Sequence, residues 1–140
     1  MKSEAEVALA CSRVGEFDLA VGAERVVLVA SWEQVVRQER ASTLDLAALL
    51  GAALPSTDRR ALGLSGPTSD LWLGMGPHVR VRRVPLRCLA PLPALLTGAG
   101  LRFACTRVLV DEEGLCFVLD AGALVELSRA QHHDSRGGRP

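Results

Sequence analysis

The chain uses one short sequence phrase twice, and this repetition constrains its fold more than any other feature. The first copy spans residues 44–50 and reads Leu-Asp-Leu-Ala-Ala-Leu-Leu; the second spans 119–125 and reads Leu-Asp-Ala-Gly-Ala-Leu-Val. In both copies an apolar, strand-like stretch precedes the Asp and an apolar helical turn follows it. An Asp at a helix start accepts hydrogen bonds from the first backbone N–H groups, which contributes about 1 kcal/mol relative to Ala. The phrase therefore predicts two similar β-rich lobes, each with a short helical turn capped by Asp45 or Asp120.

The composition agrees with a protein that folds around an aliphatic core. Of the 140 residues, 49% are hydrophobic but only 4% are aromatic, so Leu, Val and Ala must fill the interior. A chain of this length buries about 70% of its unfolded surface on folding, which is enough for it to fold without disulfide bonds. The net charge is zero, and a neutral chain exerts no long-range attraction on nucleic acid or a membrane surface.

Apolar runs separated by turn residues predict short strands along most of the chain. We expect a hairpin over 6–21, a strand covered on both faces over 26–30, a charged helical connector over 31–40, and a second hairpin over 59–75. A strand with one solvated face is expected over 79–84, followed by a proline-bearing crossing over 85–100. A last hairpin over 101–119 turns at Gly114 in a left-handed conformation.

About five strands in each half predict a mostly β fold of two small five-stranded SH3-like barrels with short helical turns. We expect residues 1–127 to form a single domain of two lobes. Residues 128–140 are polar and cannot bury much surface, so they are expected to form a flexible tail. The start of the chain does not read as a secretory leader and no apolar run is long enough to span a membrane, which predicts a cytoplasmic protein.

No grouping of residues in the sequence is typical of a catalytic or metal site, so we expect no enzyme activity and no cofactor. His132 and His133 lie in the expected tail, where ordering a flexible segment around a metal costs entropy. The acidic run Asp111-Glu112-Glu113 is typical of a solvated hairpin tip. The basic cluster lacks the interleaved aromatic residues that stack on bases, so it favours an acidic protein surface over nucleic acid; its members are Arg80, Arg82, Arg83 and Arg87.

Four cysteines are widely spaced and match no disulfide or metal-ligand pattern. Cysteine is among the most frequently buried residue types, so we expect buried free thiols that react slowly with labelling reagents. The residues are Cys11, Cys88, Cys105 and Cys116.

From about residue 7 to 127 the chain resembles the CheW-like coupling proteins of bacterial chemosensory arrays. The segment 15–21 is similar to that family's first turn and second strand, and 44–51 is similar to its strand-to-helix segment ending in Asp-Leu and two further leucines. Residues 59–75 fit its central hairpin, 86–95 its proline-bearing crossing, and 116–125 its last strand and closing turn. The resemblance implies two β-barrels, no enzyme activity, and a bridging role between chemoreceptor tips and a histidine kinase.

The resemblance also implies partners and a binding site. A methyl-accepting chemoreceptor is the expected partner, with a CheA-like histidine kinase or another CheW-like protein as a further one; nucleic acid and membrane insertion are not expected. The receptor contact is expected in a groove between the barrels, and Arg37 occupies the position of an Arg in a family motif. The receptor-binding residues implied are Val26, Leu28, Arg37, Leu73 and Met75, although alternation alone makes the apolar ones about equally well suited to a core.

The chain departs from the family between residues 29 and 44. That family carries a long loop with an Asn-x-Arg-Gly motif there, whereas this chain has a much shorter charged segment and no such motif. The departure predicts a divergent, shortened coupling protein that binds a receptor but has weak or no kinase contact. The alternative is a generic β-barrel assembly or homo-oligomerisation module.

Overall fold

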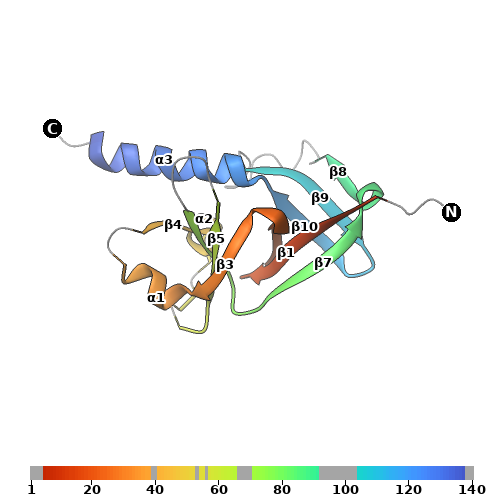
Figure 1. The fold of residues 1–140 in the computed structure, drawn as a ribbon, viewed down its shortest axis with the longest axis horizontal. Helices are drawn as coiled ribbons and strands as arrows, with labels where there is room; N and C mark the ends of the chain where they lie inside the picture. Colours follow the sequence, from red (N-terminus) through yellow and green to blue (C-terminus); the bar gives the residue numbers. More distant parts are fainter. Residues whose placement is uncertain are drawn as a thin grey trace.

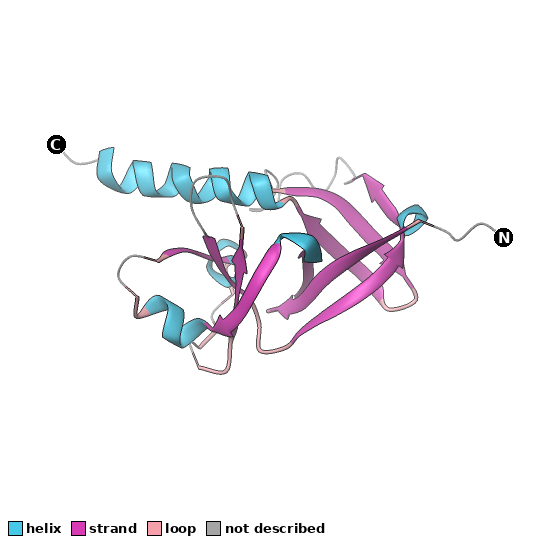
Figure 2. Cartoon of the chain, viewed as in Figure 1, coloured by secondary structure: helices cyan, strands magenta, loops and turns pink. Residues whose placement is uncertain are grey.

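The computed structural model describes residues 5–38, 41–52, 54–55, 57–65, 71–91 and 104–137, with side chains up to residue 130. Within these residues ten strands form two sheets, joined by short helices (Figures 1 and 2). The strands are β1 (Glu6–Val14), β2 (Phe17–Gly22), β3 (Val26–Ser31), β4 (Ser42–Asp45), β5 (Arg60–Leu64), β6 (Leu71–Gly74), β7 (Val79–Pro85), β8 (Leu89–Pro91), β9 (Cys105–Asp111) and β10 (Gly114–Leu119). The helices are η1 (Ala23–Arg25), α1 (Trp32–Val36), α2 (Leu46–Leu49), η2 (Leu86–Cys88) and α3 (Ala121–Gly137).

Sheet A contains strands from the first and the last parts of the described chain. Its six strands follow the order β7-β1-β2-β10-β9-β8. Strands β1 and β2 form the predicted antiparallel hairpin, and its tight turn holds Gly15 at φ 63°, a conformation that glycine adopts without steric cost. Strand β10 pairs in parallel with β2 and antiparallel with β9, so the C-terminal hairpin lies beside the N-terminal one. Gly114, at φ 117°, makes the positive-φ turn that the sequence predicted.

Sheet B is built from the middle of the chain, in the order β3-β5-β6-β4. Strands β5 and β6 form the second predicted hairpin. Strand β3 pairs antiparallel with β5 at one edge, and β4 pairs in parallel with β6 at the other. The predicted helical connector between β3 and β4 is present as the five-residue helix α1.

Both repeated phrases form the Asp-capped helix starts that the sequence predicted. The Oδ1 atom of Asp45 accepts a hydrogen bond from the backbone N–H of Ala47 at 3.0 Å, at the start of α2. The Oδ2 atom of Asp120 accepts one from the backbone N–H of Ala123 at 2.9 Å, in the first turn of α3. Each phrase therefore ends a strand and begins a helix by the same physical device.

Helix α3 is much longer than the expected turn. The sequence predicted closure near Leu127 and a flexible tail over 128–140, but the helix continues to Gly137 and runs past β5 and β4 (Figure 1). The expected boundary between domain and tail therefore falls inside a helix, and Ser128 is buried. A nucleated helix gains one backbone hydrogen bond for each residue added, so its length does not require the later residues to bury apolar surface.

Three clusters of buried side chains hold the sheets together. The largest contains apolar residues of both sheets, including Leu19 and Val21 of β2 and Leu62 of β5, together with the start of α3. A second cluster fills the concave side of sheet A and includes Leu9 and Leu109. The third packs α1 against the outer face of sheet B. The two sheets therefore share one core and each also has a smaller core of its own.

The predicted mostly β fold class, with two sheets and short helical turns, is confirmed. The ten strands divide into six and four, whereas the sequence predicted five and five, because β8 adds a strand to sheet A from within the expected crossing over 85–100. Residues 92–100 of that crossing lie outside the described residues.

Candidate protein-binding surface

Strand β3 exposes three consecutive apolar side chains at the edge of sheet B. Val27 is 60% exposed, Leu28 is 56% exposed and Val29 is 50% exposed. We call these three residues the β3 patch. The sequence predicted a strand covered on both faces here, and that prediction is wrong. A strand in the middle of two layers would be covered, but β3 is the terminal strand and in the described residues it pairs only with β5.

A β-bulge accounts for the exposure of Val27 beside Leu28, whereas Val29 pairs regularly with Leu62 and takes the opposite face of the strand from Leu28. Val26 lies opposite Leu64 and Leu28 lies opposite Gly63, so Val27 is an extra residue without a partner of its own. A bulge disrupts the alternation of side chains between the two faces and bends the strand. Leu28 also stands opposite a residue with no side chain, in the row that continues to Trp72 on β6. It therefore extends an apolar surface beyond the sheet edge.

Two of the implied receptor-binding residues are fully buried. Leu73 and Met75 each have 0% exposed surface and belong to the core shared by the two sheets. In this structure their side chains fill the seam where the resemblance implied a groove. Leu28 lies in the β3 patch, and Val26 is half-buried against the shared core.

Arg37, the fifth implied residue, lies at the end of α1 and is exposed. Its guanidinium donates to the carboxylate of Glu33 at 3.0 Å, one helical turn earlier. An exposed pair of this spacing contributes only about 0.3–0.5 kcal/mol, so Arg37 can exchange this contact for one with a partner at little cost. Helix α1 directly follows β3, which places Arg37 on the element next to the β3 patch.

A buried ion pair fixes the position of sheet B's helices. Arg59 is 4% exposed; its Nη2 donates to Asp45 Oδ1 at 2.5 Å and its Nε donates to the Met75 carbonyl at 2.8 Å. The guanidinium also lies 5.3 Å from the ring centroid of Trp32 at the start of α1. Gly74 permits this packing, because an added Cβ would stand 3.1 Å from both the guanidinium and the indole. Sequence reasoning missed this cluster, since the residues are far apart along the chain.

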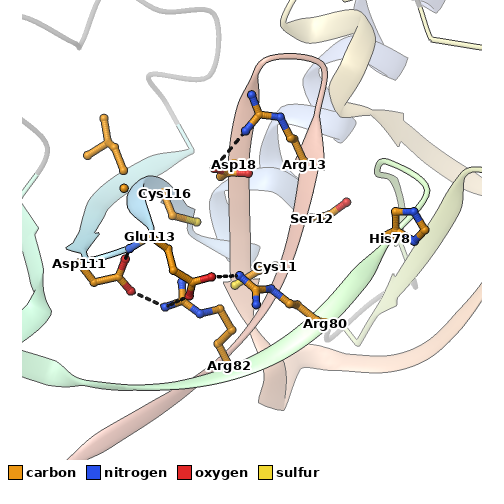
Figure 3. Close-up of a pocket in the computed structure, with 12 residues that line it drawn as sticks. Cys11, Ser12, Arg13, Asp18, His78, Arg80, Arg82, Asp111, Glu113 and Cys116 are labelled. Carbon is orange, nitrogen blue, oxygen red and sulfur yellow. Dashed lines mark hydrogen bonds and ion pairs between the residues drawn. The ribbon is translucent and has the colours of Figure 1, made fainter.

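A second charged cluster closes one end of sheet A's concave side (Figure 3). Arg82 on β7 forms ion pairs with Asp111 and, at 2.6 Å, with Glu113, and Arg80 pairs with Glu113 at 2.6 Å. Strands β1, β2 and β10 separate β7 from β9 in the sheet order, so these contacts show that sheet A curls. The hydrogen bond that Arg82 donates lowers the pKa of Asp111, and the hydrogen bond that Glu113 accepts from Arg80 raises the pKa of Arg80.

This pairing changes how the basic cluster and the acidic turn are understood. The sequence predicted Arg80 and Arg82 as a surface for an acidic protein and Asp111 and Glu113 as a solvated hairpin tip. The structure brings the two groups together, so within the chain they neutralise each other. An acidic partner would have to displace Asp111 and Glu113, which makes the β3 patch the stronger candidate for protein binding.

The described residues contain no group of three or more His, Cys, Asp or Glu that could hold a metal ion. His78 lines a cavity with Cys11 and Ser12, but in this part of the chain no hydrogen bond joins the imidazole to either. The Ser12 hydroxyl instead accepts a hydrogen bond from the backbone N–H of Gly76 at 3.0 Å. The side chains of His132 and His133 lie outside those described.

The described residues form two sheets around a shared core, with one Asp-capped helix start after β4 and another after β10. No family model and no curated protein sequence matches the chain. Among solved structures, the scaffolding protein TtCheW from Thermoanaerobacter tengcongensis has the same fold, with a TM-score of 0.66. The match has 12% sequence identity and covers 82% of this chain and 89% of that chain. Within the described residues, no helix has the length and apolar character needed to cross a membrane.

Proposed function

We propose that this chain is a non-enzymatic adaptor of a bacterial chemosensory system that binds the cytoplasmic tip of a methyl-accepting chemoreceptor. The observation that carries the proposal is the exposed β3 patch on a fold shared with a scaffolding protein. Contiguous exposed apolar surface on a soluble protein is typical of a protein-binding site. A fold alone does not determine function, so the patch supplies the site-level argument.

The proposed occupant of the patch is an α-helical receptor tip. Helical partners bind through apolar side chains repeated every three or four residues, which pack on an apolar strip. Val27 and Leu28 supply exposed apolar side chains at the edge of sheet B, Val29 adds one on the other face of the strand, and half-buried Val26 continues them toward the core. Arg37, at the end of the helix that follows β3, supplies an exposed cation outside the patch, and the rim of a protein interface is usually polar. Leu28 is the expected centre of the contact.

We further propose that contact with a CheA-like kinase is weak or lost. The support is the short connection between β3 and β4, which holds helix α1 where the coupling family carries a long loop. A divergent, shortened coupling protein of the FrzB kind fits this arrangement. Another CheW-like protein is the further partner to be tested. A cytoplasmic location follows from the proposed partners.

A binding experiment with purified partners tests the proposal. The full chain is titrated against a receptor cytoplasmic domain and, separately, against the kinase. Leu28→Asp is expected to weaken receptor binding at least about tenfold, because a charge on a central apolar contact removes more than about 1.4 kcal/mol. Val81→Asp is the matched control, since Val81 is 64% exposed on β7 of the other sheet; it should bind as the unaltered chain does.

Failure to bind any receptor domain contradicts the adaptor function. Equal losses in Leu28→Asp and Val81→Asp contradict the assignment of the β3 patch. If the unaltered chain binds the kinase as tightly as it binds the receptor, only the proposed loss of kinase contact is contradicted.

The second candidate, a homo-oligomerisation module, is favoured by the position of β3. An edge strand with exposed apolar side chains is a template for pairing with another chain. Light scattering separates the two functions. The adaptor is expected to be a monomer or weak dimer, whereas a stable oligomer dissociated by Leu28→Asp would favour self-assembly.

A further inference from the structure

Cys11 of β1 and Cys116 of β10 line one cavity of about 300 Å³ on the concave side of sheet A. The same cavity is lined by Arg80, Arg82 and Glu113, and Figure 3 shows the two sulfur atoms lying beside this charged cluster. Both cysteines are buried, with 7% and 5% exposure, but the side chains of Arg80 and Glu113 at the cavity are 63% and 51% exposed. The cavity therefore lies next to solvent-exposed side chains on this side of sheet A.

The strand register places the two thiols on the same face of sheet A, although β2 lies between their strands. Cys11 pairs with Ala20 of β2, and Ala20 pairs with Val118, two residues beyond Cys116. Two residues along a strand is the period that returns a side chain to the same face. Ala20 is fully buried and carries only a methyl group, so the curled sheet can bring the longer side chains on either side of it together. The cysteines share the same buried cluster.

The surroundings distinguish Cys11 from the other described cysteines. A hydrogen bond with the Cys116 thiol lowers the pKa of Cys11, and the charges of Arg82 and Arg80 lower it further against the opposing effects of burial and Glu113. The same hydrogen bond raises the pKa of Cys116. Burial raises the pKa of Cys105, whose Sγ lies 3.5 Å from the Arg107 carbonyl. The thiolate is the reactive form of cysteine, so these differences order the reactivity of the thiols.

We propose that Cys11 and Cys116 form a peroxide-oxidisable dithiol, with Cys11 as the attacking thiol and Cys116 as the resolving one. In the first step the Cys11 thiolate attacks one oxygen of hydrogen peroxide, the O–O bond breaks, and sulfenic acid and hydroxide form. In the second step the Cys116 sulfur attacks the Cys11 sulfur, and its proton and the sulfenic hydroxyl leave as water. Two electrons pass from the dithiol to peroxide, and the product is one disulfide that joins β1 to β10.

This proposal stands independently of the adaptor function, and it changes an expectation from the sequence. Wide spacing predicted four inert thiols, whereas the fold places two of them, which are 105 positions apart in the printed numbering, in one cavity. Oxidation would restrict movement within sheet A, because the new disulfide links the hairpin β1–β2 to the hairpin β9–β10. A reductant breaks the bond and restores both thiols.

Peroxide titration of the reduced full chain tests the proposal. The reaction is stopped with an alkylating reagent at successive times, and the cysteines are mapped by mass spectrometry after proteolysis. The expected first product is an intramolecular disulfide between the peptides of Cys11 and Cys116. Cys88 provides an internal control for exposure, because it is more exposed than the other three cysteines; Cys105 provides one for burial. Both should remain reduced while the disulfide forms.

Two substitutions separate the roles of the thiols. Cys116→Ser should leave a sulfenic acid on Cys11 that a dimedone probe captures. Cys11→Ser should slow oxidation of Cys116 at least about tenfold, because the attacking thiol is gone and burial still raises the pKa of Cys116, which leaves little thiolate. Oxidation that begins at Cys88 or Cys105, an intermolecular first product, or no oxidation at all overturns the proposal. So does an unchanged rate in Cys11→Ser. If a variant does not fold, the proposal is still tested by which cysteines of the unaltered chain are oxidised first.

Discussion

Arg59 and Asp45 form an ion pair in which one partner is nearly inaccessible to water: the side chains are 3% and 31% exposed, and Nη2 lies 2.5 Å from Oδ1. The same Asp45 oxygen accepts the hydrogen bond of the Ala47 N–H that caps α2. One carboxylate therefore has two separable roles, as a helix cap and as the counter-charge of a buried guanidinium.

Asp45→Asn should lower the free energy of unfolding by about 3 kcal/mol, because it leaves a buried cation without its counter-charge. Asparagine caps helices about as well as aspartate, so the cap itself is retained. Asp120→Asn is the matched control, since among the described residues Asp120 caps α3 without forming an ion pair; its effect should be within about 0.5 kcal/mol. Denaturant unfolding measures both values. Equal losses in the two variants would contradict a special role for the ion pair.

Leu73→Ala should lower the free energy of unfolding by about 2–5 kcal/mol, since Leu73 is fully buried in the shared core. Leu28→Ala should change it by no more than about 0.5 kcal/mol, because the Leu28 side chain is largely exposed. Thermal or denaturant unfolding of the two variants distinguishes a core position from a surface position. A large loss in Leu28→Ala would place Leu28 in the core instead.

Gly76→Ala should lower the free energy of unfolding by about 3 kcal/mol or more, because an added Cβ would stand 1.9 Å from the Arg13 carbonyl oxygen and force the backbone apart. Gly51→Ala provides the comparison. Gly51 has φ 73° and no atom within 4 Å of an added Cβ, so only the left-handed conformation is penalised, by about 1 kcal/mol. Chemical denaturation of both variants checks the prediction: the midpoint of Gly76→Ala should fall further below that of the unaltered chain than the midpoint of Gly51→Ala does.

Asp111→Asn should reduce stability at neutral pH by up to about 1 kcal/mol, the range for partly exposed ion pairs. Because Arg82 lowers the pKa of folded Asp111, the charged carboxylate stabilises the fold above its ordinary pKa of about 4. This contribution disappears as the pH falls through the lowered value. The difference between the variant and the unaltered chain should therefore shrink toward zero in acid. A difference that grows as the pH falls would refute the assigned role of Arg82.

The sequence predicted those parts of the fold that depend on local interactions. The hairpin β1–β2 and the two capped helix starts each involve residues close in sequence, so turn and capping preferences were sufficient. The same preferences did not predict the length of α3, because polar residues that bury little surface can still extend a helix that is already nucleated.

The binding surface and the charged clusters were less predictable because they depend on which strands become neighbours. A run of apolar β-branched residues reads alike in a central and an edge strand, so the exposure of Val29 could not be foreseen. The alternation of side chains along β6 predicts which face of the sheet Leu73 lies on, but it does not predict whether that face lines an open groove or a packed core. Arg82 and Asp111 are 29 positions apart, and only the curl of sheet A brings them together.

The parallel pairing of β2 with β10 has a consequence for synthesis on the ribosome. Every strand of sheet B lies between residues 26 and 74, so that sheet can assemble while the last third of the chain is still being translated. Sheet A needs β10, which ends at Leu119, before β2 gains its second neighbour. The hairpin β1–β2 is therefore translated before β10, and until β10 is available the edge of β2 stays unpaired and exposed to aggregation.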